Sequence, residues 1–231
     1  MKNHKFNSEE EFAEIIVKWL KQNDWTVYQE VQAKYGSSIA DIVAEKDGKY
    51  WIIECKLNFG FKVMQQADEW RHFANYVSIA VPYHKHSRFR EKICKLLNIG
   101  VIAVNCRYRY GYSEQNIVEN HSLQVLIPKI EQELRHKYLI NILNEKHKTF
   151  AKAGNSYGQR LTPFKLTVEK LIDYVRKNNG CLLKEAIKNI SHHYSHHRSA
   201  NCCLSRLIND DIIKELYLER KKEGNKVYLK T

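Results

Sequence analysis

An Asp-Gly pair between two apolar segments is the feature that most constrains how this chain can fold. Residues 39–44 and 50–57 are rich in β-branched, aromatic and other apolar side chains, as is typical of β-strands. Asp47-Gly48 lies between them, and this dipeptide supports the positive φ angles that a tight hairpin turn needs. We therefore predict that the two segments form neighbouring antiparallel strands.

The elements around this hairpin predict a mixed sheet. Ser8 and Glu11 have the spacing of a capping box, and the helix that follows carries apolar residues at helical spacing until it ends near Asn23. The expected order is α-β-β-β-α-β-α-β, which favours an α/β fold with helices packed on the faces of the sheet. Beyond the hairpin and first helix, we expect strands over 25–31, 76–82 and 99–105, helices over 63–75 and 87–98, and a further strand candidate over 122–128.

The C-terminal part is predicted to form a second, smaller domain. Residues 129–150 have the pattern of a long polar helix, a connector or a dimer contact, and 151–163 hold the Gly, Asn, Ser and Pro cluster of a linker. Three helical stretches follow, over 164–178, 181–191 and 197–209, and then a hairpin with a basic tip, a pattern similar to a winged helix-turn-helix. The expected division is a core over 1–128, a connector over 129–163 and a DNA-binding domain over 164–231.

The charge of the chain favours a polyanionic partner. The formal net charge is +12 and the pI is about 9.3, which suits nucleic acid first and an anionic membrane surface second, whereas a basic surface kept only for solubility is the alternative. Residues 161–231 contain 14 Lys and Arg against 8 Asp and Glu, so about half of the net charge lies in the small domain. This distribution favours DNA, expected to be double-stranded, over a protein partner.

The sequence favours a cytoplasmic protein without a membrane segment. Its first residues contain no apolar stretch typical of a signal peptide, and no run approaches the roughly 18 apolar residues that span a membrane. The six cysteines form no Cys-x-x-Cys spacing, so zinc-ribbon and iron–sulfur patterns are absent, and reduced thiols are expected.

Three charged residues at one end of the predicted hairpin carry the chemistry. Glu54 and Lys56 are two apart on a strand and so are expected to project from the same face. The Asp-Gly turn brings Asp41 alongside Glu54. Two carboxylates, a backbone carbonyl and waters suit a hard cation such as Mg²⁺, which can activate water and stabilise charge on a phosphodiester, while the lysine orients that water or stabilises the transition state. The alternative is an ordinary Glu-x-Lys pair on a surface hairpin.

With these residues, the span from about Ser8 to Asn105 resembles the PD-(D/E)XK phosphodiesterase superfamily, which includes restriction endonucleases, Holliday-junction resolvases and RecB-type nucleases. The resemblance implies a restriction-endonuclease-like mixed sheet. It also implies that Asp41, Glu54 and the carbonyl of Cys55 hold Mg²⁺ or Mn²⁺ and that Lys56 is catalytic. Ala40 stands where the family pattern has proline.

Two further site residues are suggested by their positions on helices. The family pattern includes an acid on the first helix; Glu9 is chosen because it falls in line with Ile16 and Leu20, although helix capping would explain it equally, and Glu30 is the runner-up. The segment from Gln66 to Trp70 is similar to the Gln-x-x-x-Tyr element of RecB-type nucleases. Gln66 is therefore a candidate to orient substrate or a metal-bound water, with a surface glutamine as the alternative.

The third helix and the basic tip of the second domain are the candidate DNA contacts. Arginine and asparagine on a recognition helix read guanine and adenine in the major groove, and lysines on a wing contact phosphate. The alternative is a winged helix used for protein contact or dimerisation. The candidate residues are Arg198, Ser199, Asn201 and Arg206 on the helix and Lys221, Lys222 and Lys226 at the tip.

The sequence thus predicts a metal-dependent DNA nuclease, an endonuclease, whose C-terminal domain docks DNA. The alternatives are a non-catalytic DNA-binding regulator built on a nuclease-like fold and an RNA-directed nuclease. A homodimer is a further expectation, because paired cuts need two active sites.

Overall fold

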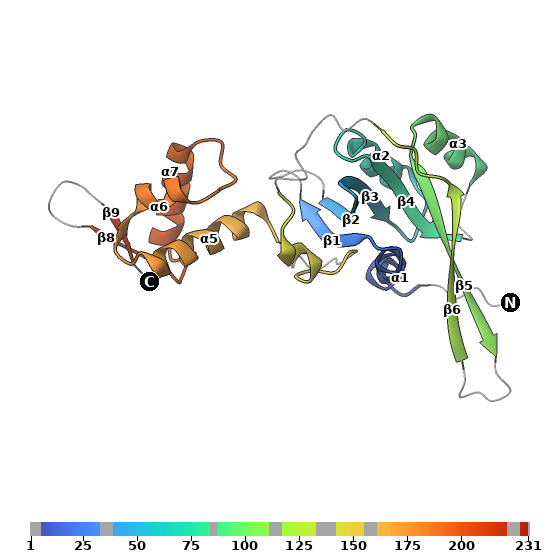
Figure 1. Ribbon diagram of the computed structural model, residues 1–231, viewed down its shortest axis with the longest axis horizontal. Coiled ribbons are helices and arrows are strands. Elements are labelled where there is room, and N and C mark those ends of the chain that lie inside the picture. Colours follow the sequence, from blue (N-terminus) through green and yellow to red (C-terminus); the bar gives the residue numbers. More distant parts are fainter. Residues whose placement is uncertain are drawn as a thin grey trace. The chain divides into compact units, whose positions relative to one another are not determined.

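A computed structural model describes residues 6–32, 39–83, 87–110, 117–132, 142–154, 161–220 and 227–230. The chain divides into two compact units between Leu161 and Thr162 (Figure 1). Each unit has its own buried cluster of apolar side chains, so each is described by itself.

The first unit is built on a six-stranded mixed sheet whose strands lie side by side in chain order (Figure 1). The two central pairings, β3 with β4 and β4 with β5, are parallel, and the outer three are antiparallel. This arrangement confirms an α/β fold with a mixed sheet flanked by helices. The strands are β1 (Thr26–Gln32), β2 (Ile39–Lys46), β3 (Lys49–Cys55), β4 (Tyr76–Pro82), β5 (Gly100–Tyr110) and β6 (Ile117–Ile127).

The predicted hairpin joins β2 and β3. Lys46 pairs with Lys49, so the turn between them has two residues. Asp47 and Gly48 have φ angles of 53° and 72°, the left-handed backbone that this kind of turn requires. The hairpin prediction is therefore confirmed, and it fixes the register of the two strands.

Helix α1 (Glu9–Gln22) covers one face of the sheet. Its side chains Phe12, Ile16 and Leu20 are fully buried and pack with residues of β2 and β3. The Ser8 hydroxyl accepts a hydrogen bond from the Glu11 amide at 3.1 Å, as a capping box predicts. The reciprocal bond is shifted by one residue, because the Glu11 carboxylate accepts from the backbone of residue 7 rather than from that of Ser8.

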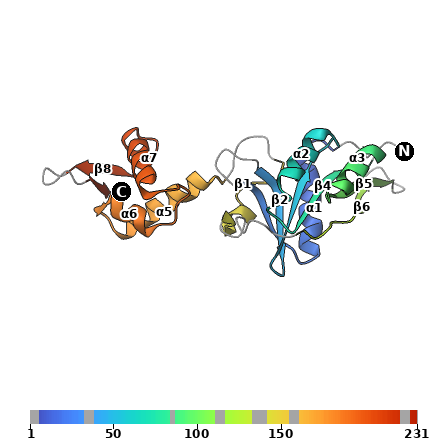
Figure 2. The same ribbon diagram turned by 90° about the horizontal axis from the view of Figure 1, so that it is seen from above.

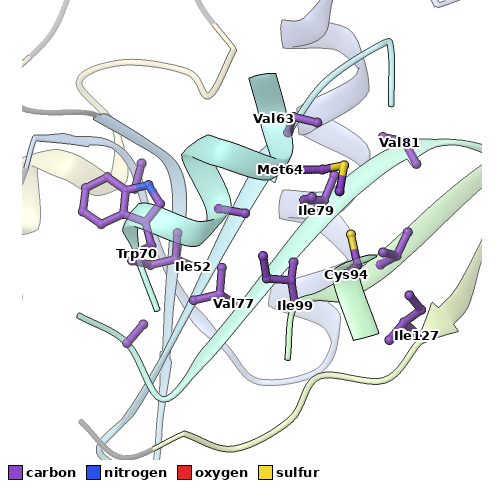
Figure 3. Packing of buried hydrophobic residues seen from close by; sticks show 14 of the residues in the cluster. Ile52, Val63, Met64, Trp70, Val77, Ile79, Val81, Cys94, Ile99 and Ile127 are labelled. Carbon is purple, nitrogen blue, oxygen red and sulfur yellow. The ribbon is translucent and has the colours of Figure 1, made fainter. Parts of the chain in front are cut away.

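Helices α2 (Phe61–Glu69) and α3 (Arg88–Leu96) cover the opposite face. Figure 3 shows Met64 of α2 and Cys94 of α3 packed over Ile79 of β4, with the ring of Trp70 beside Ile52 of β3. The two helices connect parallel strands, so each begins at the end of the sheet where the preceding strand finishes.

The prediction of one helix over 129–150 is wrong at both ends of that range. Residues 129–132 are not helical, residue 142 is helical, and between 143 and 154 the regular structure is a single 3₁₀ turn, η2 (Glu145–Lys148); residues 133–141 lie outside the described ranges. The Lys129 ammonium lies 4.0–4.1 Å from the ring centroids of Trp25, Trp51 and Tyr76. This contact is a cation–π interaction at the end of the sheet.

The segment predicted as a linker belongs in part to the first unit. Ala151 and Ala153 are buried, and Leu161 is also buried. The amides of Ala153 and Gly154 donate hydrogen bonds to the side chains of Gln29 and Glu30 on β1. The Gly, Asn and Ser residues at 155–158 lie outside the described ranges.

The second unit combines three helices, labelled in Figure 2, with a small antiparallel sheet of order β7-β9-β8. Its core contains Leu171, Val175, Leu204 and Leu229. The three helices lie within a few residues of the predicted ranges. The elements are α5 (Pro163–Lys177), β7 (Cys181–Leu182), α6 (Leu183–Asn189), α7 (His197–Asn209), β8 (Tyr217–Arg220) and β9 (Val227–Lys230).

Candidate metal centre

Asp41 and Glu54 lie opposite each other at one end of the β2–β3 hairpin. Ile42 pairs with Ile53, and continuing this register sets Asp41 against Glu54. Glu54 is fully buried and Asp41 is 8% exposed. Asp41 Oδ2 accepts a hydrogen bond of 2.8 Å from the Cys55 amide. Two acidic side chains thus share a volume that is nearly closed to solvent.

The surroundings of this carboxylate pair disfavour two negative charges. Burial, and then the charge of Asp41, raise the pKa of Glu54 well above its usual range. Burial also raises the pKa of Asp41, although the Lys56 ammonium and the Cys55 amide act against it. Two ionised carboxylates repel, so their contact becomes favourable only when a proton or a cation lies between them.

Lys56 holds its ammonium beside Asp41 and Glu9. Nζ lies 2.8 Å from Glu9 Oε2 and 3.8 Å from Asp41 Oδ2. Burial acts to lower the pKa of Lys56, but the charge of Asp41 and the bond to Glu9 outweigh it and raise the pKa. Lys56 is therefore a stable cation. Glu9 lies in the first turn of α1, and its carboxylate pairs with the lysine.

The donor set fits a hard divalent cation. Glu54 Oε2 is buried and has no hydrogen-bond partner among the described residues, which leaves one carboxylate oxygen able to bind an ion. The described residues contain no group of three or more His, Cys, Asp or Glu side chains that could hold a metal. The protein ligands would then be two carboxylates and the Cys55 carbonyl, with the other positions left to water or phosphate, as is common for Mg²⁺.

Trp70 is a site residue whose role the sequence did not reveal. Its indole nitrogen donates a 2.7 Å hydrogen bond to Glu54 Oε1, and the side chain is buried beneath α2. The sequence feature that could have indicated this role is the position of Trp70 four residues after Gln66, because residues at this spacing lie on one face of a helix. Gln66 is half-buried, and its Oε1 is buried with no partner in the part of the chain that is described.

Glu30 of β1 is linked to the site through Gly154. It has a φ of 51° in β1, it is buried, and its Oε1 accepts from the Gly154 amide at 2.9 Å. Gly154 in turn lies against the backbone of Glu9: a Cβ built at residue 154 would come within 2.7 Å of the Glu9 carbonyl carbon. The runner-up acid thus fixes the segment that packs against Glu9.

The candidate DNA contacts belong to the second unit. Arg198, Ser199 and Arg206 are exposed on α7, and Asn201 is half-buried with its Oδ1 enclosed. The predicted phosphate contacts Lys221, Lys222 and Lys226 lie outside the described residues.

No family model, no curated protein and no solved structure matches this chain. The described helices include none that combines the length and the apolar character needed to cross a bilayer.

Proposed function

We propose that this chain is a metal-dependent nuclease that hydrolyses DNA phosphodiester bonds, acting as an endonuclease. The observation that carries the proposal is the buried Asp41–Glu54 pair with the Lys56 ammonium 3.8 Å from Asp41. A buried pair of carboxylates is costly without a counter-ion. A neighbouring ammonium that keeps its proton can stabilise the negative charge that develops on a phosphodiester during attack by water.

The residues divide the work by their chemistry. Asp41, Glu54 and the Cys55 carbonyl would hold Mg²⁺ or Mn²⁺, and the bound ion would supply an activated water and charge stabilisation. Lys56, whose pKa is raised by Asp41 and Glu9 against the effect of burial, retains its proton and so serves as a charge stabiliser rather than as a base. Glu9 positions Lys56 through the 2.8 Å ion pair. Gln66, with its enclosed amide oxygen, is the candidate to orient water.

The second unit is proposed to dock DNA as a winged helix-turn-helix. Its order of helices and strands resembles that fold, and Arg198 and Arg206 lie exposed on α7. Arg198→Ala should weaken DNA binding and, if the arginine contacts phosphate, reduce the salt slope of binding by about 1. Lys184→Ala, at an exposed position on α6, is the control. Equal binding by both variants would remove α7 from the interface.

The test of the proposed activity uses supercoiled plasmid, Mg²⁺ and two variants with different expected effects. Glu54→Gln should abolish both cleavage and Mg²⁺ binding measured by calorimetry, because it removes a ligand charge. Lys56→Met should reduce cleavage by about a hundredfold or more while Mg²⁺ binding persists. Lys49→Met is the matched control, since Lys49 begins the same strand and pairs with Glu131 instead.

Full cleavage by Glu54→Gln and Lys56→Met, or cleavage that persists in a chelator, would overturn the assignment. Mg²⁺ binding without cleavage of any DNA would favour the non-catalytic DNA-binding regulator. Cleavage of RNA in preference to DNA in a labelled competition would favour the RNA-directed enzyme.

A further inference from the structure

Two phenylalanines are exposed where α2 and α3 begin. Phe61 is 63% exposed and Phe89 is 65% exposed. The helices start after β3 and β4 respectively, and these parallel strands finish at the same end of the sheet. Glu54 and Lys56 also lie at the end of β3. Both rings are therefore displayed on the end of the sheet that carries the carboxylate pair.

Cationic residues neighbour both rings in the sequence, and one of them contacts Phe61. The Arg90 guanidinium carbon lies 6.0 Å from the centroid of the Phe61 ring, within the range of a cation–π contact. Arg90 directly follows Phe89 in α3, Lys62 directly follows Phe61, and Arg88 directly precedes Phe89; Lys62 and Arg88 are exposed. We call Phe61, Phe89 and Arg90 the aromatic platform.

The two exposed rings of the aromatic platform are not needed to anchor their helices on the sheet. Helix α2 buries Val63, Met64 and Ala67 against the sheet, and α3 buries Cys94, so both helices are anchored without the exposed rings. A single exposed apolar side chain is common, but here the starts of two helices each expose a ring, and an arginine of α3 lies over the ring of α2, which gives this surface a defined chemistry. Aromatic rings flanked by cations stack bases while the cations neutralise phosphate.

We propose that the aromatic platform stacks unpaired DNA bases, so that the substrate of this enzyme is DNA with a single-stranded or splayed segment next to the bond that is cut. The inference rests on the proposed nuclease function, which it makes more specific. In an intact duplex each base face is covered by its neighbours, whereas an unpaired base offers a face to Phe61 or Phe89. The local basic residues and the net charge of +12 favour a nucleic acid over a protein on this surface.

The first experiment measures binding without cleavage, using the full chain in a chelator. The probes are a splayed-arm DNA and a duplex of the same length, each carrying a fluorescent adenine analogue whose emission is quenched on stacking. The wild type should quench the probe in the splayed arm and bind that DNA more tightly. Phe61→Leu and Phe89→Leu should each weaken binding to splayed DNA by about tenfold and leave duplex binding unchanged.

Two control variants test whether binding needs the aromatic ring itself or only an exposed apolar side chain. Phe61→Tyr keeps a ring and should retain the quenching. Leu96→Ala removes an apolar side chain that is 74% exposed at the other end of α3, and it should have no effect. Unchanged quenching in both Phe→Leu variants, an equal loss on duplex DNA, or tighter binding of single-stranded RNA would overturn the proposal.

The second experiment adds Mg²⁺ and compares cleavage of the same two DNAs. Faster cleavage of splayed DNA by the wild type, with the preference lost in the Phe→Leu variants, supports the platform. If DNA is cleaved but the variants retain the preference, the platform fails and the nuclease stands. If no DNA is cleaved while the quenching pattern holds, the nuclease fails and the platform stands as a DNA-binding surface.

Discussion

The indole nitrogen of Trp70 donates a 2.7 Å hydrogen bond to Glu54 Oε1, and this bond joins the end of α2 to the carboxylate pair. Trp70 is the donor to Glu54 Oε1, whereas Glu54 Oε2 has no hydrogen-bond partner in the described structure. The bond lowers the pKa of Glu54, against the larger effects of burial and of Asp41. Trp70 therefore favours the ionised carboxylate that a cation needs.

Trp70→Phe keeps a ring in the core and removes this donor. With less support for its charged form, Glu54 should hold a proton more strongly, and a cation must displace that proton. We expect Mg²⁺ affinity at neutral pH to fall by about tenfold, and the deficit to shrink as the pH is raised. Calorimetry at two pH values measures both effects. Trp19→Phe on α1, on the opposite face of the sheet, is the control, and equal affinities in the two variants would contradict the role of Trp70.

The metal-free protein should lose stability as the pH rises. Burial and Asp41 raise the pKa of Glu54, so above the ordinary Glu value of 4.5 the folded state binds more protons than the unfolded state. Across that range the free energy of unfolding falls by up to about 1.4 kcal/mol for each tenfold drop in proton concentration, until the raised pKa is passed. Mg²⁺ should restore the loss, because it replaces the proton.

Urea unfolding followed by tryptophan fluorescence tests this dependence. The four tryptophans, at 19, 25, 51 and 70, all lie in the first unit, so the signal reports that unit. Glu54→Gln is the matched control, since it keeps an oxygen to accept from Trp70 and cannot titrate. Parallel pH profiles for the wild type and Glu54→Gln would show that Glu54 is not the group responsible.

Local patterns predicted most of the first unit. The Asp47-Gly48 turn and the register it sets brought Asp41 opposite Glu54, because a two-residue hairpin leaves little freedom in pairing. The cap at Ser8 placed Glu9 on the first turn of α1. These features depend on residues close together in the sequence, where spacing carries the information.

Contacts between distant segments could not be predicted in the same way. The polar pattern of 129–150 favoured a helix, but Lys129 lies over the rings of Trp25 and Trp51, which are about 100 and 80 residues earlier in the sequence and are brought there by the fold of the sheet. The small residues Ala153 and Gly154 are compatible with a linker, but close packing of Gly154 against the backbone of Glu9 in α1 also requires a residue without a side chain. The Trp70–Glu54 bond likewise depends on how α2 packs on β3.

Lys129 should stabilise the first unit through the three rings around it. Its ammonium lies 4.0–4.1 Å from the centroids of Trp25, Trp51 and Tyr76, and the side chain is half-buried. Lys129→Ala should lower the free energy of unfolding by about 1–2 kcal/mol, since it removes both the cation–π contacts and the packing of the side-chain stem. Tryptophan fluorescence in urea measures the change. The Lys148 ammonium lies 5.3 Å from the single ring of Tyr28, so Lys148→Ala should change stability much less. Equal losses in the two variants would contradict a stabilising contact between Lys129 and its three rings.

Gly154 links the last segment of the first unit to the site. Its φ is 77°, and a Cβ would lie 2.7 Å from the carbonyl carbon of Glu9, too close for the backbone to accept without moving. Gly154→Ala should therefore destabilise the first unit and displace Glu9, the partner of Lys56, which lowers cleavage as well. Gly48→Ala is the matched control, because Gly48 has a φ of 72° and no atom within 4 Å of its Cβ position.

Both substitutions force alanine into left-handed backbone, at a cost of about 1–2 kcal/mol. Any further loss of stability in Gly154→Ala relative to Gly48→Ala therefore measures the contact with Glu9. We expect this further loss to be about 1–3 kcal/mol, because the backbone must move. Glu9→Gln should reproduce the loss of cleavage without the loss of stability, since it weakens the ion pair with Lys56 and leaves the backbone in place. If Gly154→Ala matches Gly48→Ala in both stability and cleavage, the segment at 154 does not support the site.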